Sequence, residues 1–179
     1  MEFNTSTQKA IELASKVRLL ALDVDGILTD GRLYFSNRGE ELKTFHTLDG
    51  HGIKMLQERK IEIALITGRT STILEQRAAE LEIVNVFQGC CNKLSSLNTI
   101  LENQSYSIDE VAYAGDDLPD LDAIRAVGLS FSVPNAHPTV KAAVDAITSL
   151  NGGWGAVREI SDFILESQGK SPLLNKSTS

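Results

Sequence analysis

Cysteine, aromatic side chains and long apolar runs are all scarce in this sequence of 179 residues. Its two cysteines, Cys90 and Cys91, are adjacent, so they predict neither a disulfide scaffold nor a zinc site, and we expect reduced thiols. No stretch approaches the roughly 20 apolar residues of a membrane-spanning helix, and residues 1–16 lack the apolar core of a signal peptide. The sequence therefore predicts a cytoplasmic protein.

Positive charge is also limited, since 17 Lys and Arg residues stand against 24 Asp and Glu residues and give a formal net charge of −7. A nucleic-acid partner would need a basic stripe, and we find none. An acidic chain can still bind an anionic substrate where a metal ion and a few cations lie in the site. The composition, 42% hydrophobic and 23% charged, is typical of a globular protein, and the length predicts a single domain covering 1–179.

Short apolar runs alternate with helical patterns along the chain. The expected strands are 19–22, 61–66, 84–87, 111–114, 129–133 and 146–147, and the expected helices are 52–59, 71–81, 93–102, 118–126, 139–144 and 156–166. Nearly continuous apolar strands are typical of sheets covered on both faces. The pattern therefore predicts an α/β fold, a Rossmann-like three-layer sandwich with a mainly parallel sheet.

Two segments depart from this alternation. Residues 33–35 and 40–45, on either side of a turn that contains Asn37 and Gly39, predict a small β-hairpin inserted at about 31–46. The polar tail at 169–179 predicts either a flexible segment or one that docks on a partner.

Polar residues follow four of the expected strands, at the sheet edge where ligands bind in open α/β folds. They are Asp23, Asp25 and Gly26 after the first strand, Thr67, Gly68 and Arg69 after the second, Lys93 after the third, and Asp116, Asp117 and Asp120 after the fourth. Any one of these motifs alone has a structural interpretation as a turn, a solvated lysine or an acidic helix start. Their combination favours a phosphoryl-transfer site.

The chemistry assigns a role to each group. A carboxylate such as Asp23 can attack phosphorus and form an aspartyl-phosphate, provided that a divalent cation offsets the repulsion between the two anions. Asp25, which Gly26 allows to face the same pocket, can exchange protons with the leaving oxygen and with water. Asp116 supplies another oxygen ligand, a donor set that favours Mg²⁺, and Thr67 and Lys93 can bind the phosphoryl group. We expect either Asp117 or Asp120 to orient the metal ligands.

These residues resemble the motifs of the haloacid dehalogenase superfamily of phosphotransferases. Within it, the chain is similar to the 3-deoxy-D-manno-octulosonate 8-phosphate (Kdo 8-phosphate) phosphatases, through the extension Leu28 to Gly31, the hairpin, Leu48 to Ile53 and Gly152 to Glu159. The resemblance implies a capless phosphatase of lipopolysaccharide biosynthesis, with metal ligands from Asp23, Asp116 and the main-chain carbonyl of Asp25. It also implies a homotetramer in which a neighbouring subunit covers the site. Some members have Arg where Leu48 and Trp154 stand.

The substrate implied by this resemblance carries a carboxylate as well as a phosphate. A guanidinium is the best match for a carboxylate, so Arg69 and Arg77 are candidate contacts. The expected substrate-binding set is Asp25, His46, Thr47, Leu48, Asp49, Gly50, Lys54, Arg69, Arg77 and Lys93. Three other functions stay open: a phosphatase of a nine-carbon sialic-acid phosphate, a phospho-accepting receiver domain and a non-catalytic scaffold.

Overall fold

The computed structural model describes residues 1–37, 41–102 and 104–170. Within these ranges one seven-stranded sheet has the order β1-β9-β8-β7-β2-β5-β6. Its strands are β1 (Glu2–Phe3), β2 (Leu19–Leu22), β5 (Glu62–Ile66), β6 (Asn85–Phe87), β7 (Val111–Ala114), β8 (Leu129–Ser132) and β9 (Ala146–Ile147). Every neighbouring pair is parallel except β1 with β9. The predicted α/β fold with a mainly parallel sheet is confirmed.

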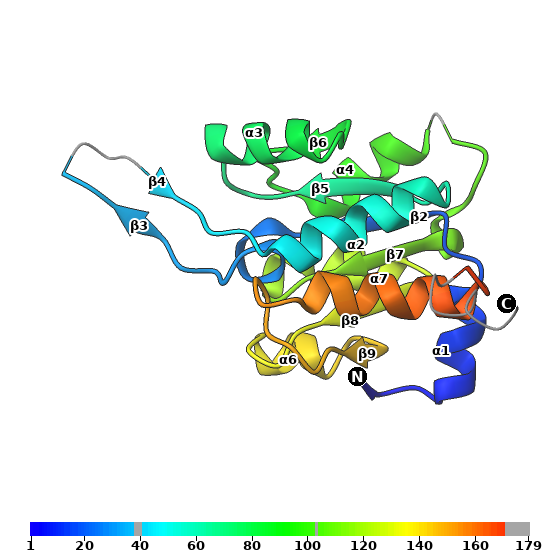
Figure 1. Ribbon diagram of the computed structural model, residues 1–179. Helices are drawn as coiled ribbons and strands as arrows, with labels where there is room; N and C mark the ends of the chain where they lie inside the picture. The colour runs from blue at the N-terminus through cyan, green and yellow to red at the C-terminus, as the bar shows by residue number, and fades with distance from the viewer. Residues whose placement is uncertain (38–40, 103, 171–179) are drawn as a thin grey trace, which may run out of the picture.

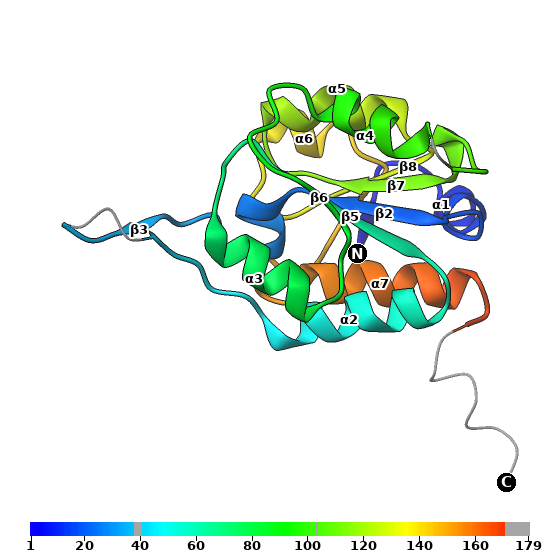
Figure 2. The ribbon, with the colours of Figure 1, turned by 90° about the horizontal axis from the view of Figure 1, so that it is seen from above.

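Helices cover both faces of this sheet (Figures 1 and 2). On one face lie α1 (Thr7–Ala14), α2 (Thr47–Glu58), α3 (Thr72–Glu80) and α7 (Ala156–Ser167), and on the other α4 (Lys93–Leu101), α5 (Leu121–Ala126) and α6 (Pro138–Lys141). The central strands β2 and β7 are buried along their whole length, because both of their faces pack against helices. The short helical turns are η1 (Val24–Leu28), η2 (Ile108–Glu110) and η3 (Leu118–Asp120).

The register of the central strands decides where the loops emerge. Leu22, the last residue of β2, is paired with Leu65 of β5 and with Ala114 of β7. Since parallel strands run in the same direction, the residues that follow these three strands leave the sheet at one edge. The loops after β2, β5 and β7 therefore meet there.

Several boundaries differ from the sequence-based expectations. The prediction missed β1 and α1, which are short; β1 pairs with β9. Helix α2 begins at Thr47 rather than at 52, although it contains Gly50 and Gly52. A Cβ at Gly52 would lie 3.1 Å from Arg158 Cα of α7, so the glycine permits close packing of the two helices, which outweighs its poor helix propensity.

The predicted hairpin is present and projects from the body of the molecule (Figures 1 and 2). Its strands β3 (Tyr34–Phe35) and β4 (Glu41–Leu42) pair in antiparallel fashion, apart from the main sheet. Residues 38–40 of its predicted turn, residue 103 and residues 171–179 of the tail lie outside the described residues. None of the described helices is both long enough and apolar enough to cross a membrane.

Candidate active site

The loop after β2 carries the first pair of carboxylates. Asp23 directly follows the strand, and the chain then turns through η1, where Gly26 adopts a φ of +100°. A Cβ at Gly26 would lie 2.0 Å from Asp116 Oδ2, so only glycine allows the loop after β7 to approach the loop after β2 this closely. The turn that the sequence predicted at Gly26 therefore also leaves the space in which the carboxylate of Asp116 lies.

Lys93 connects Asp23 with Asp120. Its Nζ lies 2.8 Å from Asp23 Oδ1 and 2.6 Å from Asp120 Oδ1, and its side chain is 6% exposed. Burial by itself would lower the pKa of Lys93, but the charges of Asp23 and Asp120 outweigh that effect and raise the pKa above its usual value. Lys93 is therefore a buried, charged group of the site. The alternative interpretation, a solvated lysine at the start of a helix, does not apply.

Asp120 is fully buried and accepts four hydrogen bonds. Oδ1 accepts one from Lys93 and one, at 2.7 Å, from the hydroxyl of Tyr113, while Oδ2 accepts those of the main-chain N–H groups of Asp116 and Asp117, each at 3.1 Å. These bonds occupy both oxygens and fix the loop that carries Asp116. We expected either Asp117 or Asp120 to orient the metal ligands, and of the two it is Asp120 that holds the loop of Asp116.

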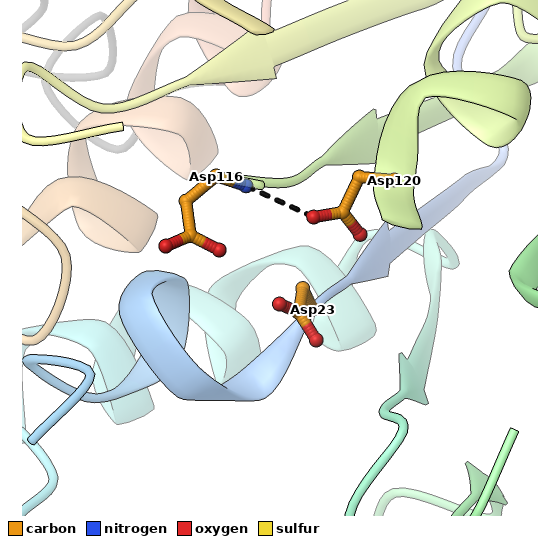
Figure 3. Close-up of side chains that lie close together, drawn as sticks. All are labelled: Asp23, Asp116 and Asp120. Carbon is orange, nitrogen blue, oxygen red and sulfur yellow. Dashed lines mark hydrogen bonds between the residues drawn. The ribbon is translucent and has the colours of Figure 1, made fainter. Parts of the chain in front are cut away.

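The carboxylates of Asp23, Asp116 and Asp120 converge from two segments, the one after β2 and the one after β7 (Figure 3). One oxygen of each lies within 4.8 Å of the other two. The donors are all carboxylate oxygens, without sulfur or imidazole, and this set suits Mg²⁺. Since the oxygens of Asp120 are already engaged, Asp23 and Asp116 are the side chains best placed to hold such an ion.

The electrostatics of the cluster also fit a cation. Burial, followed by the charge of Asp120, raises the pKa of Asp23 to about 8, against the attraction of Lys93. The same two causes raise the pKa of Asp116 to about 6. A single ammonium group is thus too little positive charge for three neighbouring carboxylates, and a divalent cation would favour their ionised forms.

Thr67 and Arg69 border the same cavity on the β5 side. Thr67 is buried directly after β5, where its Oγ1 accepts a hydrogen bond of 3.2 Å from the main-chain N–H of Arg69. Because of this turn, the backbone from Thr67 to Arg69 runs along the edge of the cavity. A cavity of about 490 Å³ is lined by Asp23, Asp25, Gly31, Thr67, Gly68, Arg69, Cys90, Cys91, Lys93, Asp116, Asp117, Pro119 and Asp120. All four predicted catalytic residues therefore lie on one cavity.

Asp25 lies between two cations at the mouth of this cavity. Lys43 Nζ donates to Asp25 Oδ1 at 2.5 Å, and Arg69 Nε lies 3.7 Å from Asp25 Oδ2. Lys43 follows β4 of the hairpin and was absent from the predicted site. Lys43 lies within the expected hairpin strand 40–45, and nothing in the sequence linked that strand to Asp25.

The remaining predicted substrate residues lie outside the catalytic cavity. His46 caps α2 and lines a neighbouring cavity of about 350 Å³, together with Trp154. Another cavity, of about 270 Å³, is lined by Thr47, Gly50, His51, Lys54, Arg77, Glu80 and Leu81. Apart from Leu48 and Asp49, the predicted set is therefore divided among three cavities.

Several of the predicted substrate residues outside the catalytic cavity interact with other parts of the protein. Asp49 is fully buried and accepts hydrogen bonds from the main-chain N–H groups of Gly155 and Arg158, so it caps the start of α7 instead of facing a ligand. Lys54 pairs with Glu82, and Arg77 lies over the ring of Phe45 at 5.6 Å. Leu48, which is 48% exposed, lines none of the three cavities.

The glycines of the segment from Gly152 to Glu159 have a packing role. A Cβ at Gly152 would lie 1.7 Å from the carbonyl oxygen of Gly26, and one at Gly153 would lie 2.4 Å from the main-chain nitrogen of Asp30. The loop before α7 therefore rests directly on the backbone of η1 and of the residues after it. It supports the turn that carries Asp25 without contributing a side chain to the catalytic cavity.

The sequence and the fold have close relatives. Residues 77–160 match the family model described as haloacid dehalogenase-like hydrolase. The chain is 47% identical over 157 residues to the 3-deoxy-D-manno-octulosonate 8-phosphate phosphatase of Salmonella typhi, covering 88% of this chain and 84% of that protein. It is 46% identical over 160 residues to the phosphatase of the same name from Escherichia coli, covering 89% and 85%.

Two solved structures show the same likeness. The phosphatase of this name from Yersinia pestis superposes with a TM-score of 0.90 at 42% identity, covering 95% of this chain and 90% of that one. The one from Moraxella catarrhalis, in complex with a magnesium ion, a phosphate ion and a KDO molecule, has a TM-score of 0.90 at 40% identity, with coverage of 92% and 94%.

Proposed function

Because the chain belongs to the 3-deoxy-D-manno-octulosonate 8-phosphate phosphatases of the haloacid dehalogenase superfamily, we propose that it hydrolyses Kdo 8-phosphate to Kdo and inorganic phosphate. This reaction is a step in building lipopolysaccharide. The observation that carries the proposal is the cluster of Asp23, Lys93 and Asp116 on one cavity, in a chain that matches phosphatases of this activity along most of its length.

The residues of the cavity support a two-step reaction. An oxygen of Asp23 attacks phosphorus, and the bond from phosphorus to the sugar oxygen breaks while that oxygen takes a proton from Asp25. Water then attacks the aspartyl-phosphate, Asp25 takes the proton of that water, and phosphate leaves with Asp23 restored. Lys93 and the hydroxyl of Thr67 hold the phosphoryl oxygens during both steps.

Mg²⁺ is the cofactor that the donor set of this cavity fits. Asp23, Asp116 and the main-chain carbonyl of Asp25 would hold it, and when bound it neutralises charge on the phosphoryl oxygens and on the carboxylates. Asp120 keeps Asp116 in place through the main-chain N–H groups of the loop. The buried positions of Asp23 and Lys93 limit the access of bulk water to the attacking oxygen.

We also propose that the chain forms a single cytoplasmic domain that assembles into a homotetramer. The hairpin extends away from the body and exposes apolar side chains, with Phe35 exposed by 64%, Leu42 by 54% and Tyr34 by 43%. Such surface is stabilised when a second subunit covers it. A neighbouring subunit at the hairpin would bring a second surface to the open cavity, and the cavities lined by His46, Lys54 and Arg77 would then complete the substrate site.

A phosphate-release assay over a panel of sugar phosphates, with and without Mg²⁺, tests the proposal. We expect Kdo 8-phosphate to give the highest kcat/KM, activity to be lost in excess chelator, and Mg²⁺ to restore it. A higher kcat/KM for a nine-carbon sialic-acid phosphate would instead support that substrate. Full activity in chelator would rule out the metal role, and stable phosphorylation without turnover would support a receiver function.

A further inference from the structure

Lys43 is buried although it belongs to the exposed hairpin arm. Its side chain is only 2% exposed, and its Nζ donates to Oδ1 of Asp25, which lies in the loop after β2. Lysine is almost never buried without an anionic partner, since its charge loses hydration there. Asp25 is such a partner, so the contact links the base of the arm to a residue of the catalytic cavity.

The two oxygens of Asp25 have different surroundings. Oδ1 is held by Lys43, whereas Oδ2 is buried and accepts no hydrogen bond from the part of the chain that the structure describes. Arg69 Nε, 3.7 Å from Oδ2, is a second cation of the described residues near this carboxylate. One oxygen is thus held by a hydrogen bond, and the other, which faces Arg69, accepts none from the described residues.

We propose that Lys43 is a positioning residue for Asp25. By holding Oδ1, it keeps the side chain of Asp25 in the rotamer that presents Oδ2 to the leaving oxygen, so that proton transfer occurs from a fixed geometry. This inference rests on the proposed function, in which Asp25 protonates the leaving sugar oxygen. It also means that the hairpin arm, through Lys43, contributes to the chemistry and not only to assembly.

Two other roles for Lys43 make different predictions. A lysine that bound the phosphoryl group would stabilise every phosphate ester in a similar way, and a lysine that only tethered the arm would affect folding or assembly. A positioning role toward the general acid matters most where the leaving group needs a proton. An alkyl phosphate such as Kdo 8-phosphate needs one, whereas p-nitrophenyl phosphate expels a stable phenolate without it.

The experiment compares Lys43→Met with the wild type on these two esters in saturating Mg²⁺. Since general acid catalysis contributes about 10²–10⁴-fold, we expect kcat/KM, which covers the steps up to departure of the leaving group, to fall by about 10–100-fold for Kdo 8-phosphate and by less than about threefold for p-nitrophenyl phosphate. Lys43→Arg should recover part of the loss on Kdo 8-phosphate. Lys16→Met, which removes an equal charge from an exposed lysine paired with Glu12, is the matched control and should behave as the wild type on both esters.

A second measurement removes the group through which Lys43 acts. In an Asp25→Asn background, adding Lys43→Met should change the residual turnover of p-nitrophenyl phosphate by less than about twofold, because the positioned acid is already absent. Equal losses of kcat/KM on both esters, or a further large loss in that background, would overturn the proposal. The size of each variant in gel filtration and its melting temperature show whether folding or assembly has changed. If neither changes, the loss of activity is attributed to the position of Asp25.

The activity of the wild type on Kdo 8-phosphate tests the proposed function separately from the role of Lys43. If the wild type does not hydrolyse Kdo 8-phosphate, the same comparison is made with the alkyl phosphate that it hydrolyses best. The ratio between the alkyl and aryl esters then still decides the role of Lys43.

Discussion

The carboxylate of Asp116 packs directly against the Cα of Gly26, so that a Cβ on Gly26 would lie 2.0 Å from Asp116 Oδ2. This contact joins the loops after β2 and β7, which are far apart in the sequence and adjacent in the sheet. It has two requirements, space for the carboxylate and a φ of +100°. Both exclude any side chain larger than hydrogen at this position.

Gly26→Ala should therefore abolish turnover while the protein still folds. The clash displaces Asp116, and the positive φ adds strain of about 1–3 kcal/mol. We expect kcat/KM to fall by at least about 100-fold and the Mg²⁺ requirement to rise, as measured by phosphate release across a Mg²⁺ titration. Gly169→Ala is the control, because Gly169 also has a positive φ, of 64°, but a Cβ there meets no atom within 4 Å. Loss of activity in both variants would mean that strain, and not the clash, is responsible.

Asp23→Asn should remove activity and, without metal, raise stability at high pH. Burial raises the pKa of Asp23 to about 8 from an ordinary value of 3.8, so the folded protein binds this proton more tightly than the unfolded chain. The metal-free wild type therefore loses stability as the pH rises from about 4 to about 8, a loss that the uncharged Asn escapes. Lys93 keeps Asp120 as a partner in this variant.

Thermal melts between pH 4 and pH 9 in chelator check this sign. At pH 8 we expect Asp23→Asn to melt higher than the wild type, by on the order of 5 °C, and the gap to close toward pH 4. Mg²⁺ should stabilise the wild type more than the variant. Asp122→Asn, at an exposed position of α5, should show neither effect. A gap that widens toward pH 4 would contradict the assigned direction of the pKa shift.

Asp120→Ala should destabilise the protein and weaken Mg²⁺ binding together. Its removal leaves the buried ammonium of Lys93 with fewer partners and frees the loop of Asp116. Breaking such a buried pair costs about 3–5 kcal/mol, which urea unfolding would measure. Tyr113→Phe, which removes one hydrogen bond to the same carboxylate, should cost only about 1 kcal/mol. If Asp120→Ala unfolded like the wild type, the carboxylate would not be holding this loop.

Arg69→Ala tests how the substrate carboxylate is recognised. We expect a loss of roughly 1.5–3 kcal/mol in kcat/KM for Kdo 8-phosphate, the scale of a hydrogen bond to a charged group. A sugar phosphate without a carboxylate, which has a similar alkyl leaving group, should be affected little. Arg125→Ala, an exposed arginine on α5, is the control. Equal losses on both esters would point instead to a role of Arg69 toward phosphate or Asp25.

Phe35→Asp tests the assembly that we propose for the hairpin. Placing a charge on the exposed arm should convert the tetramer into smaller species in light scattering, because the charge would lose hydration in the interface. Val84→Asp is a demanding control, since Val84 is exposed by 88% but lies beside β6, away from the arm. A tetramer that survives Phe35→Asp, or one that Val84→Asp also dissociates, would place the interface elsewhere.

Much of the fold and of the candidate site followed from local features of the sequence. The strands β2 and β7 are continuous apolar runs, and each is followed at once by its polar residues, Asp23 and Asp116. Because parallel strands end at a common edge, the order of these runs was sufficient to predict the shared cavity. The roles assigned to Asp25, Thr67 and Lys93 stay predictions, although all of these residues lie on that cavity.

Other features depended on contacts between residues that are distant in the sequence. Asp49 looked like part of a substrate motif, yet it caps α7 through Gly155 and Arg158, and no pattern near Asp49 reveals a helix that begins a hundred residues later. Helix α2 extends through two glycines because α7 and Arg77 pack closely against them. Local propensity could not foresee this packing.

The sequence by itself determined the parallel strands of the sheet and which acids follow them, because both depend on short-range pattern. Only the tertiary structure decided which oxygens of these acids accept hydrogen bonds. Lys43 occupies one oxygen of Asp25, and four donors occupy both oxygens of Asp120. Hydrogen bonds of this kind depend on the positions of side chains in space, and burial makes them decisive, since a buried charge is stable only where its partners are present.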